Sequence, residues 1–130
     1  MESLSVHTSQ REEMVNITSA VQEMIRQNGW KKGAVHLFCP HTTCGLTINE
    51  GADPDVCRDL LKFFQEIAPR IHGWRHSEGN SDAHIRSSLL GCSLLVPVEA
   101  GKLMLGTWQS IYLYEGDGPR HRQIWLQSLR

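Results

Sequence analysis

The sequence predicts a single α+β domain with a largely antiparallel sheet, two main helices and a short third helix. Its 130 residues are the size of one domain, and no linker, repeat or low-complexity tract divides residues 1–130. Short runs of alternating apolar residues follow one another towards the C-terminus, as in successive hairpins. Segments with helical apolar spacing stand apart from these runs, which favours α+β over a regular alternation of strands and helices.

The first 29 residues predict one strand and one helix. Leu4 and Val6 alternate with polar neighbours, as in a half-buried strand. Ser9 and Glu12 have the spacing of a capping box, which predicts that a helix begins here and ends at Asn28-Gly29. The apolar face of this helix would consist of Met14, Ile17, Val21, Met24 and Ile25.

The middle of the chain predicts two neighbouring strands and the second main helix. The strands are Gly33–Cys39 and Cys44–Ile48. Asp53-Pro54 is a strong helix start, because Asp caps the first turn and Pro has no N–H to leave unbonded there. This helix would end at Pro69, and its apolar face would consist of Val56, Leu60, Phe63, Phe64 and Ile67.

The C-terminal part predicts a short helix and then only strands. Ser81-Asp82 would open the helix, which runs to Leu90 and ends at Gly91. Turn residues at Glu99–Gly101 and Gly116–Pro119 separate the strand candidates that follow. These candidates are Ser93–Val98, Lys102–Thr107, Ser110–Glu115 and Gln123–Leu129.

Composition excludes several classes of protein. The formal net charge is −1, so no overall basic field attracts nucleic acid, and we expect no nucleic-acid partner. No window approaches the roughly 18 apolar residues that a membrane span needs, and the N-terminus lacks the apolar core of a signal peptide. The four cysteines form no C-x-x-C pair and are expected to be reduced and buried. These features predict a cytoplasmic protein without a membrane partner.

Three histidines in polar motifs are the first candidate site. His76 and His84 belong to the dense polar run Trp74–His84, and His41 begins the motif His41-Thr42-Thr43. Three imidazoles plus a water are a catalytic zinc arrangement, so we interpret the set as catalytic groups and metal ligands. The alternative is that they hydrogen-bond within a polar loop or a subunit contact, and their spacing leaves both interpretations open.

Acidic residues stand beside the same motifs. Glu50 follows an apolar strand at its end, where fixed polar groups tend to be displayed, and is a candidate general base or metal-orienting group. Glu78 lies within the polar run and is a second candidate. Asp82 has a competing role as a cap of the short helix.

The beginning of the short helix predicts an anion site. Asn80 and Ser81 would surround free backbone N–H groups at the positive end of the helix dipole. Arg86 adds a guanidinium that can hold phosphate in bidentate fashion. We therefore interpret these three residues as substrate-binding and expect a small phosphorylated molecule, although a solvated surface arginine is an equal alternative.

The motif Gly106-Thr107-Trp108-Gln109 interrupts a run of strand residues. Trp108 offers a flat surface for stacking, and Gln109 an amide that can recognise a heteroaromatic edge, so both are predicted to bind substrate. The alternative is a Trp buried in the core with a Gln at an interface.

Three separated segments together resemble the YjbQ family of small bacterial and archaeal proteins. They are HTTCGLTINEGADPDVCRDL, HSEGNSDAHIRSSLLG and SLLVPVEAGKLMLGTWQSIYLYEGDGPR, and the resemblance extends from about Leu4 to Leu126. It implies a sandwich-like sheet arrangement and a homotrimer. It also implies a secondary thiamine-phosphate synthase, which joins a pyrimidine diphosphate to a thiazole phosphate and releases pyrophosphate, as a main or a side activity. The implied functional residues are His41, His76, His84, Glu50, Asn80, Trp108 and Gln109.

The residues alone support two further hypotheses. One is a metal-dependent hydrolase with a metal-bound water at His41, His76 and His84. The other is a non-catalytic trimer that binds a small ligand. The cofactor is also open, because three histidines suit zinc, whereas diphosphate chemistry commonly uses magnesium held by carboxylates.

Overall fold

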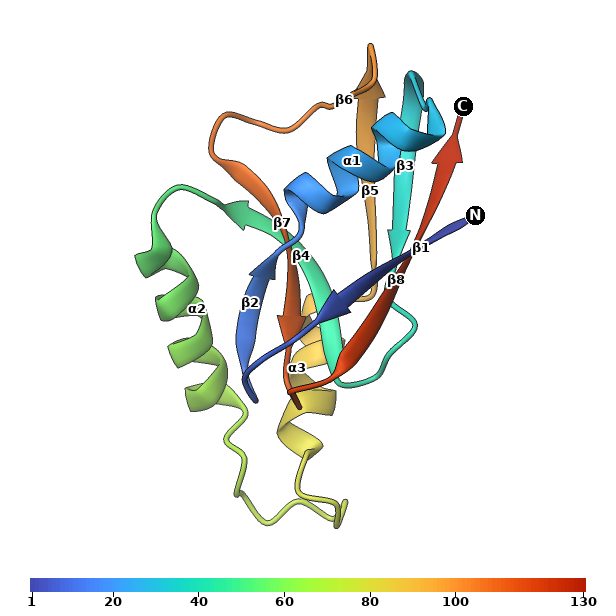
Figure 1. Cartoon of the computed structure of the whole chain (residues 1–130). Coiled ribbons are helices and arrows are strands. Elements are labelled where there is room, and N and C mark those ends of the chain that lie inside the picture. Colours follow the sequence, from blue (N-terminus) through green and yellow to red (C-terminus); the bar gives the residue numbers. More distant parts are fainter.

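The computed structural model describes all of residues 1–130 as three helices and eight strands (Figure 1). The strands are β1 (Glu2–His7), β2 (Glu13–Asn16), β3 (Lys32–Phe38), β4 (Cys44–Glu50), β5 (Ser93–Glu99), β6 (Lys102–Leu103), β7 (Gln109–Glu115) and β8 (His121–Leu129). The helices are α1 (Thr18–Asn28), α2 (Pro54–Ile67) and α3 (Ser81–Leu90).

Two antiparallel sheets form a curled half-barrel. One sheet has the strand order β1-β8-β3-β5-β6, and the other has the order β2-β7-β4. Every pairing is antiparallel. The predicted class, one α+β domain with largely antiparallel sheets, two main helices and a short third helix, is confirmed.

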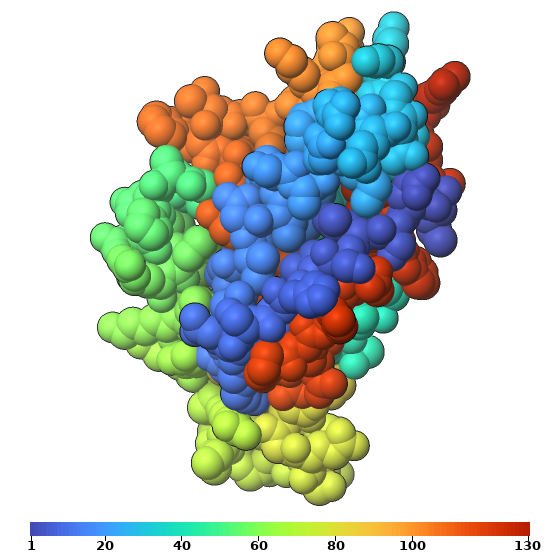
Figure 2. Space-filling view, in the orientation of Figure 1, coloured from blue at the N-terminus to red at the C-terminus, as the bar shows by residue number.

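The core lies between the inward faces of the two sheets and is closed by α1. Val35 and Leu126 come from the five-stranded sheet, and Leu113 from the three-stranded sheet, all fully buried. Val21 and Ile25 of α1 are also fully buried in this cluster. Figure 2 shows α1 lying across the front of the molecule, while the segment before α3 projects at the lower end. Burial of this continuous apolar cluster is the main favourable contribution to folding.

Helices α2 and α3 cover the outer face of the three-stranded sheet. Phe64 of α2 packs edge-on against Tyr114 of β7 with 5.4 Å between ring centroids. The Ser87 hydroxyl of α3 donates to the Cys44 carbonyl of β4 at 2.7 Å. Helix α3 lies so close to β4 that a Cβ on Gly45 would be 2.9 Å from the Gly91 carbonyl oxygen. The position of α3, and of the loop before it, is therefore fixed by β4.

The predicted helix start at Ser9 and Glu12 is wrong. Residues 13–16 form β2, which pairs with β7, and α1 begins only at Thr18. Glu13, and not Glu12, accepts the backbone N–H groups of Ser9 and Gln10, which closes a turn, while the Glu12 carboxylate bonds to Arg11 and Arg86. Pairing with a strand about a hundred residues away outweighs the local helical signal.

Two strand predictions also need correction. The segment Lys102–Thr107 forms a strand only at Lys102–Leu103, because the chain then leaves the five-stranded sheet and crosses to the other sheet (Figure 1). The last strand begins two residues earlier than predicted, at His121, where it pairs with His7.

Candidate functional site

The predicted site residues divide into two groups at opposite ends of the β4–β7 ladder. At one end Cys44 pairs with Glu115, and at the other end Glu50 pairs with Gln109. Six residue steps of about 3.4 Å separate the two ends, which is about 20 Å. We call the group His41, His76, Asn80, Ser81 and His84 the histidine end, and the group Glu50, Trp108 and Gln109 the tryptophan end. One chain therefore does not bring all the predicted residues into one site.

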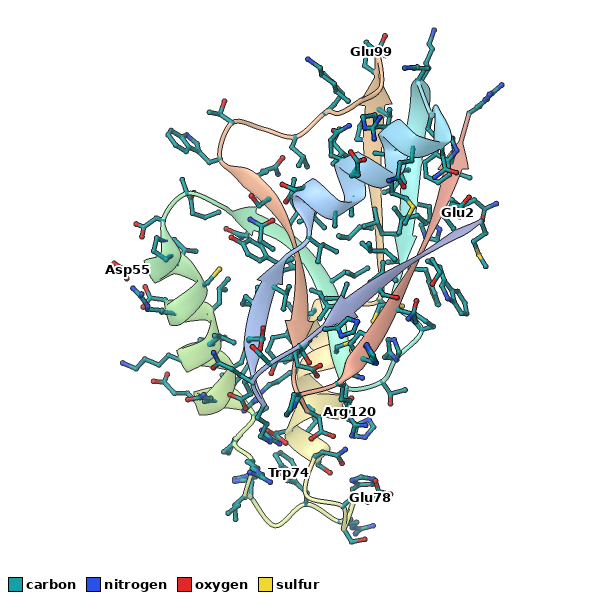
Figure 3. All side chains as sticks on the ribbon, in the orientation of Figure 1. Glu2, Asp55, Trp74, Glu78, Glu99 and Arg120 are labelled. Atoms are coloured by element: carbon teal, nitrogen blue, oxygen red, sulfur yellow. The ribbon has the colours of Figure 1, made fainter.

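Two histidines of the histidine end lie side by side. His76 comes from the loop before α3, and His84 from the helix itself. Their ring centroids are 5.2 Å apart in an edge-on arrangement. A carboxylate oxygen of Glu78 lies 3.9 Å from His76 Nε2. Trp74 and Glu78 mark this loop at the lower end of the molecule, far from Glu99 at the upper end (Figure 3). The two imidazole rings are close enough for both to hydrogen-bond to one bound group.

Asn80 fixes the beginning of α3 to the turn after β7. Its Nδ2 donates to Asp117 Oδ2 at 2.9 Å, and Arg120 donates to the same oxygen at 2.9 Å. Burial opposes ionisation of Asp117, but these bonds outweigh it and hold the pKa of its carboxyl below the usual value. Asn80 Oδ1 is buried and has no hydrogen-bond partner. An unpaired buried acceptor costs free energy, so a donor from outside the chain would bind favourably there.

Ser81 is buried in the first turn of α3. Asn80 precedes the helix as its N-cap without a side-chain capping bond. Asp82 does not cap the helix either, because its carboxylate is engaged by arginines. Both terminal nitrogens of Arg11 donate to it at 3.0 Å, and a terminal nitrogen of Arg86 lies 3.2 Å from it. The Ala83 and His84 N–H groups donate to the Asn80 carbonyl, so the N–H groups of Ser81 and Asp82 are the ones that no side chain caps, and Asp82 places a negative charge beside them.

His41 is half-buried against β8. The backbone N–H of Gln123 donates to His41 Nε2 at 3.0 Å. Burial and the charge of Arg122 lower the pKa of the imidazole, which therefore stays neutral near pH 7. The same Nε2 lies 3.1 Å from the Gln123 carbonyl oxygen, so both polar groups of the Gln123 backbone hold the ring against β8.

The His41 segment and α3 meet at one turn. The N–H of Gly116 donates to the Thr43 carbonyl at 3.0 Å, and a Cβ on Gly116 would lie 2.9 Å from Ala83 Cβ. Only a glycine fits between the two segments. Even so, no three His, Cys, Asp or Glu side chains of the chain gather into a cluster that could hold a metal ion. The three histidines do not fit a metal site within one chain.

Arg86 has a structural role that excludes the predicted contact with substrate. Its side chain is 1% exposed and its Nε donates to the Phe64 carbonyl at 3.1 Å. One terminal nitrogen donates to the Ala68 carbonyl at 2.7 Å, and the other bonds to Glu12 and to the Tyr114 hydroxyl. Because all three nitrogens bond within the chain and the side chain is buried, Arg86 joins the end of α2 to α3 and does not present a bidentate pair of donors to a phosphate.

The tryptophan end displays an aromatic face beside a fixed amide. Trp108 is 65% exposed, so the alternative of a buried core tryptophan is wrong. Gln109 Oε1 accepts the Gly106 N–H at 2.8 Å, which fixes the amide. The Glu50 carboxylate accepts the Ala52 N–H at 2.7 Å and so shapes the turn after β4. These residues border a shallow hollow of about 200 Å³.

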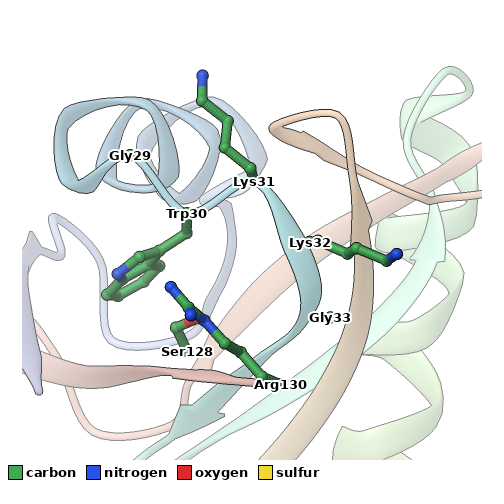
Figure 4. Close-up of a pocket in the computed structure, with 7 residues that line it drawn as sticks. All are labelled: Gly29, Trp30, Lys31, Lys32, Gly33, Ser128 and Arg130. Carbon is green, nitrogen blue, oxygen red and sulfur yellow. The ribbon is translucent and has the colours of Figure 1, made fainter.

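A separate cavity contains none of the predicted residues. It has a volume of about 370 Å³ and lies where α1 leads into β3. The side chain of Arg130 reaches toward Trp30, whereas the side chains of Lys31 and Lys32 extend away from Trp30 (Figure 4).

Sequence reasoning missed two side-chain pairs. Cys39 Sγ and Cys44 Sγ lie 3.2 Å apart in the core. His7 and His121 face each other across β1 and β8 with 2.5 Å between their Nε2 atoms. The register of β1 against β8 creates the second pair, and no local pattern reveals that register. For the cysteines, five-residue spacing across a predicted hairpin was the available signal.

The fold and site define a class of small α+β half-barrel proteins with a polar, histidine-bearing end. The chain belongs to the YjbQ family: residues 2–130 match the model described as UPF0047 protein YjbQ-like. The UPF0047 protein YugU of Bacillus subtilis is 47% identical and aligned over 99% of this chain and 98% of its own. The UPF0047 protein YjbQ of Salmonella typhimurium is 46% identical over 74% of each chain.

Solved structures share the fold throughout. A crystal structure of an uncharacterised YjbQ/UPF0047 protein of Clostridium acetobutylicum has a TM-score of 0.95 at 44% identity and covers 99% of this chain and 100% of that one. A conserved hypothetical protein of Thermus thermophilus has a TM-score of 0.94 at 48% identity, with the same coverage. None of this chain's helices has the length and apolar character needed to cross a bilayer.

Proposed function

We propose that the protein is a transferase of the thiamine-phosphate synthase type, whose site is completed between two copies of the chain in a homotrimer. The observation that carries this proposal is the separation of the histidine end from the tryptophan end by about 20 Å of the β4–β7 ladder. A heterocycle with a phosphate needs both a stacking surface and an anion site, and neither end supplies both. Two copies supply them together where the histidine end of one lies beside the tryptophan end of the next.

The histidine end suits the diphosphate. The first turn of α3 offers a positive dipole end and the uncapped N–H groups of Ser81 and Asp82, and the His76–His84 pair lies on the same turn and the loop before it. In the reaction a thiazole ring nitrogen forms a bond to the pyrimidine methylene carbon while the carbon–oxygen bond to the diphosphate breaks. Pyrophosphate leaves with the electron pair, so its developing charge must be neutralised, and imidazole N–H donors together with fixed backbone N–H groups do this.

The tryptophan end suits the ring. A pyrimidine can stack on the exposed face of Trp108, while the amide N–H groups of Gln109 remain free to recognise a ring nitrogen, because the amide oxygen is bonded to Gly106. Holding a ring nucleophile and its electrophile in fixed orientation supplies much of the rate of such a step.

The outer face of the five-stranded sheet is the surface that we propose for assembly. Neither α2 nor α3 covers it, since both pack on the other sheet. Phe38 and Trp125 stack on it with ring centroids 5.8 Å apart, and Leu95 is 61% exposed. Exposed apolar groups of this kind mark contact surfaces, and a homotrimer would bury them.

The activity is tested with both thiamine precursors and magnesium. Wild-type protein should form thiamine phosphate and pyrophosphate above a blank without enzyme, and His84→Ala should reduce product to the blank. Because His84 lies half-exposed in a polar segment, the variant should keep its thermal midpoint. No product from wild-type protein at high concentration would refute the transferase.

A metal-dependent hydrolase is the second candidate, and the His76–His84 pair favours it. Two imidazoles need further ligands, which a second copy or the substrate would supply, and zinc or magnesium would be the metal. Activity on phosphoesters that a chelator abolishes would favour this candidate.

A non-catalytic ligand-binding trimer would instead show thermal stabilisation by a phosphorylated metabolite without turnover.

A further inference from the structure

Two buried thiols face each other at the base of the loop that carries His41. Cys39 directly follows β3, and Cys44 begins β4. Their sulfur atoms are 3.2 Å apart, and the residues are 2% and 0% exposed. A disulfide requires about 2.05 Å between the sulfurs, so an approach of about 1.2 Å would join them.

A third thiol lies on the surface next to this pair. The Cys39 N–H donates to the Cys92 carbonyl at 2.7 Å, which continues the antiparallel register of β3 and β5 by one residue. Residues opposite each other in this register point to the same face of a sheet. Cys92 and Cys39 thus lie one residue beyond the paired ends of β5 and β3, and of these two thiols Cys92 is exposed and Cys39 is buried.

We propose that Cys39 and Cys44 are an oxidation site at which a hydroperoxide forms an intramolecular disulfide across the base of the His41 loop. The Cys39 thiolate attacks the terminal peroxide oxygen, the O–O bond breaks, and an alcohol or water leaves. The resulting sulfenic acid is attacked by the Cys44 sulfur, which loses its proton, and water leaves. Two thiols and one hydroperoxide thus give one disulfide, one alcohol and one water.

The disulfide would act directly on the histidine end. The loop that it closes contains His41 and Thr43, and the Thr43 carbonyl accepts the Gly116 N–H. The Cys44 carbonyl accepts the Ser87 hydroxyl of α3, so a shift of Cys44 reaches the helix that carries His84. This inference does not depend on the proposed transferase, because disulfide formation is measured without any substrate.

The test uses Cys57→Ser, which leaves one cysteine pair in the tryptic peptide Gly33–Arg58 and Cys92 in the separate peptide Ser87–Lys102. The folded variant is treated with hydrogen peroxide, denatured, alkylated and digested. We expect peptide Gly33–Arg58 to lose about 2 Da and to take up no alkylating reagent. Reduction before alkylation should restore two alkylated cysteines.

Three results would overturn the proposal. One is full alkylation of Cys39 and Cys44 after a dose that oxidises the exposed Cys92. Another is a disulfide between Cys39 and Cys92 in place of the buried pair. The third is the same yield of Cys39–Cys44 disulfide when the chain is oxidised unfolded in denaturant, because the folded arrangement would then contribute nothing.

Discussion

Asn80 and Asp117 are joined by a 2.9 Å hydrogen bond that ties the beginning of α3 to the turn after β7. The bond uses the Asn80 amide nitrogen and leaves Oδ1 buried without a partner. The helix start is thus placed by a residue 37 positions away, and it retains one acceptor for a donor that the single chain does not supply.

The Asp117 bond predicts an acid-sensitive contribution to stability. The native pKa of Asp117 is below its usual value, whereas the unfolded value is about 3.9. The carboxylate therefore contributes stability that is complete above the unfolded pKa and is lost as the pH falls through the native pKa. We expect Asp117→Asn to be less stable than wild type at pH 6, with the difference shrinking below about pH 4. Urea denaturation at a series of pH values measures this, and parallel pH profiles would contradict it.

Arg86→Met should destabilise the fold strongly. The substitution removes the bonds to α2 and leaves the Asp82 carboxylate, which is fully buried, with Arg11 as its remaining guanidinium partner. We expect a loss of about 3 kcal/mol in the free energy of unfolding. Arg58→Met is the matched control, since its exposed pair with Asp55 should contribute less than about 1 kcal/mol. Unchanged stability together with lost phosphate binding would restore the sequence interpretation of Arg86.

Trp108 should matter for turnover and not for folding. Its side chain is mostly exposed, so Trp108→Ala should change the free energy of unfolding by less than about 0.5 kcal/mol. Loss of stacking should lower kcat/KM for the pyrimidine diphosphate about ten- to a hundredfold. Trp108→Phe retains an aromatic face and should recover most of this loss. Equal kcat/KM for the Ala and Phe variants would exclude stacking.

Elements with complete local signals were predictable from the sequence. Asp53 accepts the Asp55 N–H and Pro54 opens α2, as the helix-start pattern indicates. Gly29 ends α1 in a left-handed conformation with φ of 64°. At Ser9 and Glu12 the local signal was misleading, because pairing of β2 with β7 decides the conformation of the next residues.

The candidate site was only partly predictable, for a different reason. His76 and His84 belong to one polar run, and the structure brings their rings together. The separation of His84 from Trp108 depends on strand register, and the burial of Arg86 depends on how α2 packs. Neither the register nor this packing has a signature in the local sequence.

Mixing two variants that are each impaired at one end of the site tests the central claim, a site shared between copies, most directly. His84→Ala and Trp108→Ala are unfolded together, refolded at equal concentration and assayed for thiamine phosphate. If each site takes its histidine end from one copy and its tryptophan end from the next, random assembly restores about a quarter of the sites. We predict about a quarter of wild-type activity from the mixture and only residual activity from each variant alone. A mixture no more active than the two variants separately, in confirmed mixed trimers, would contradict a shared site.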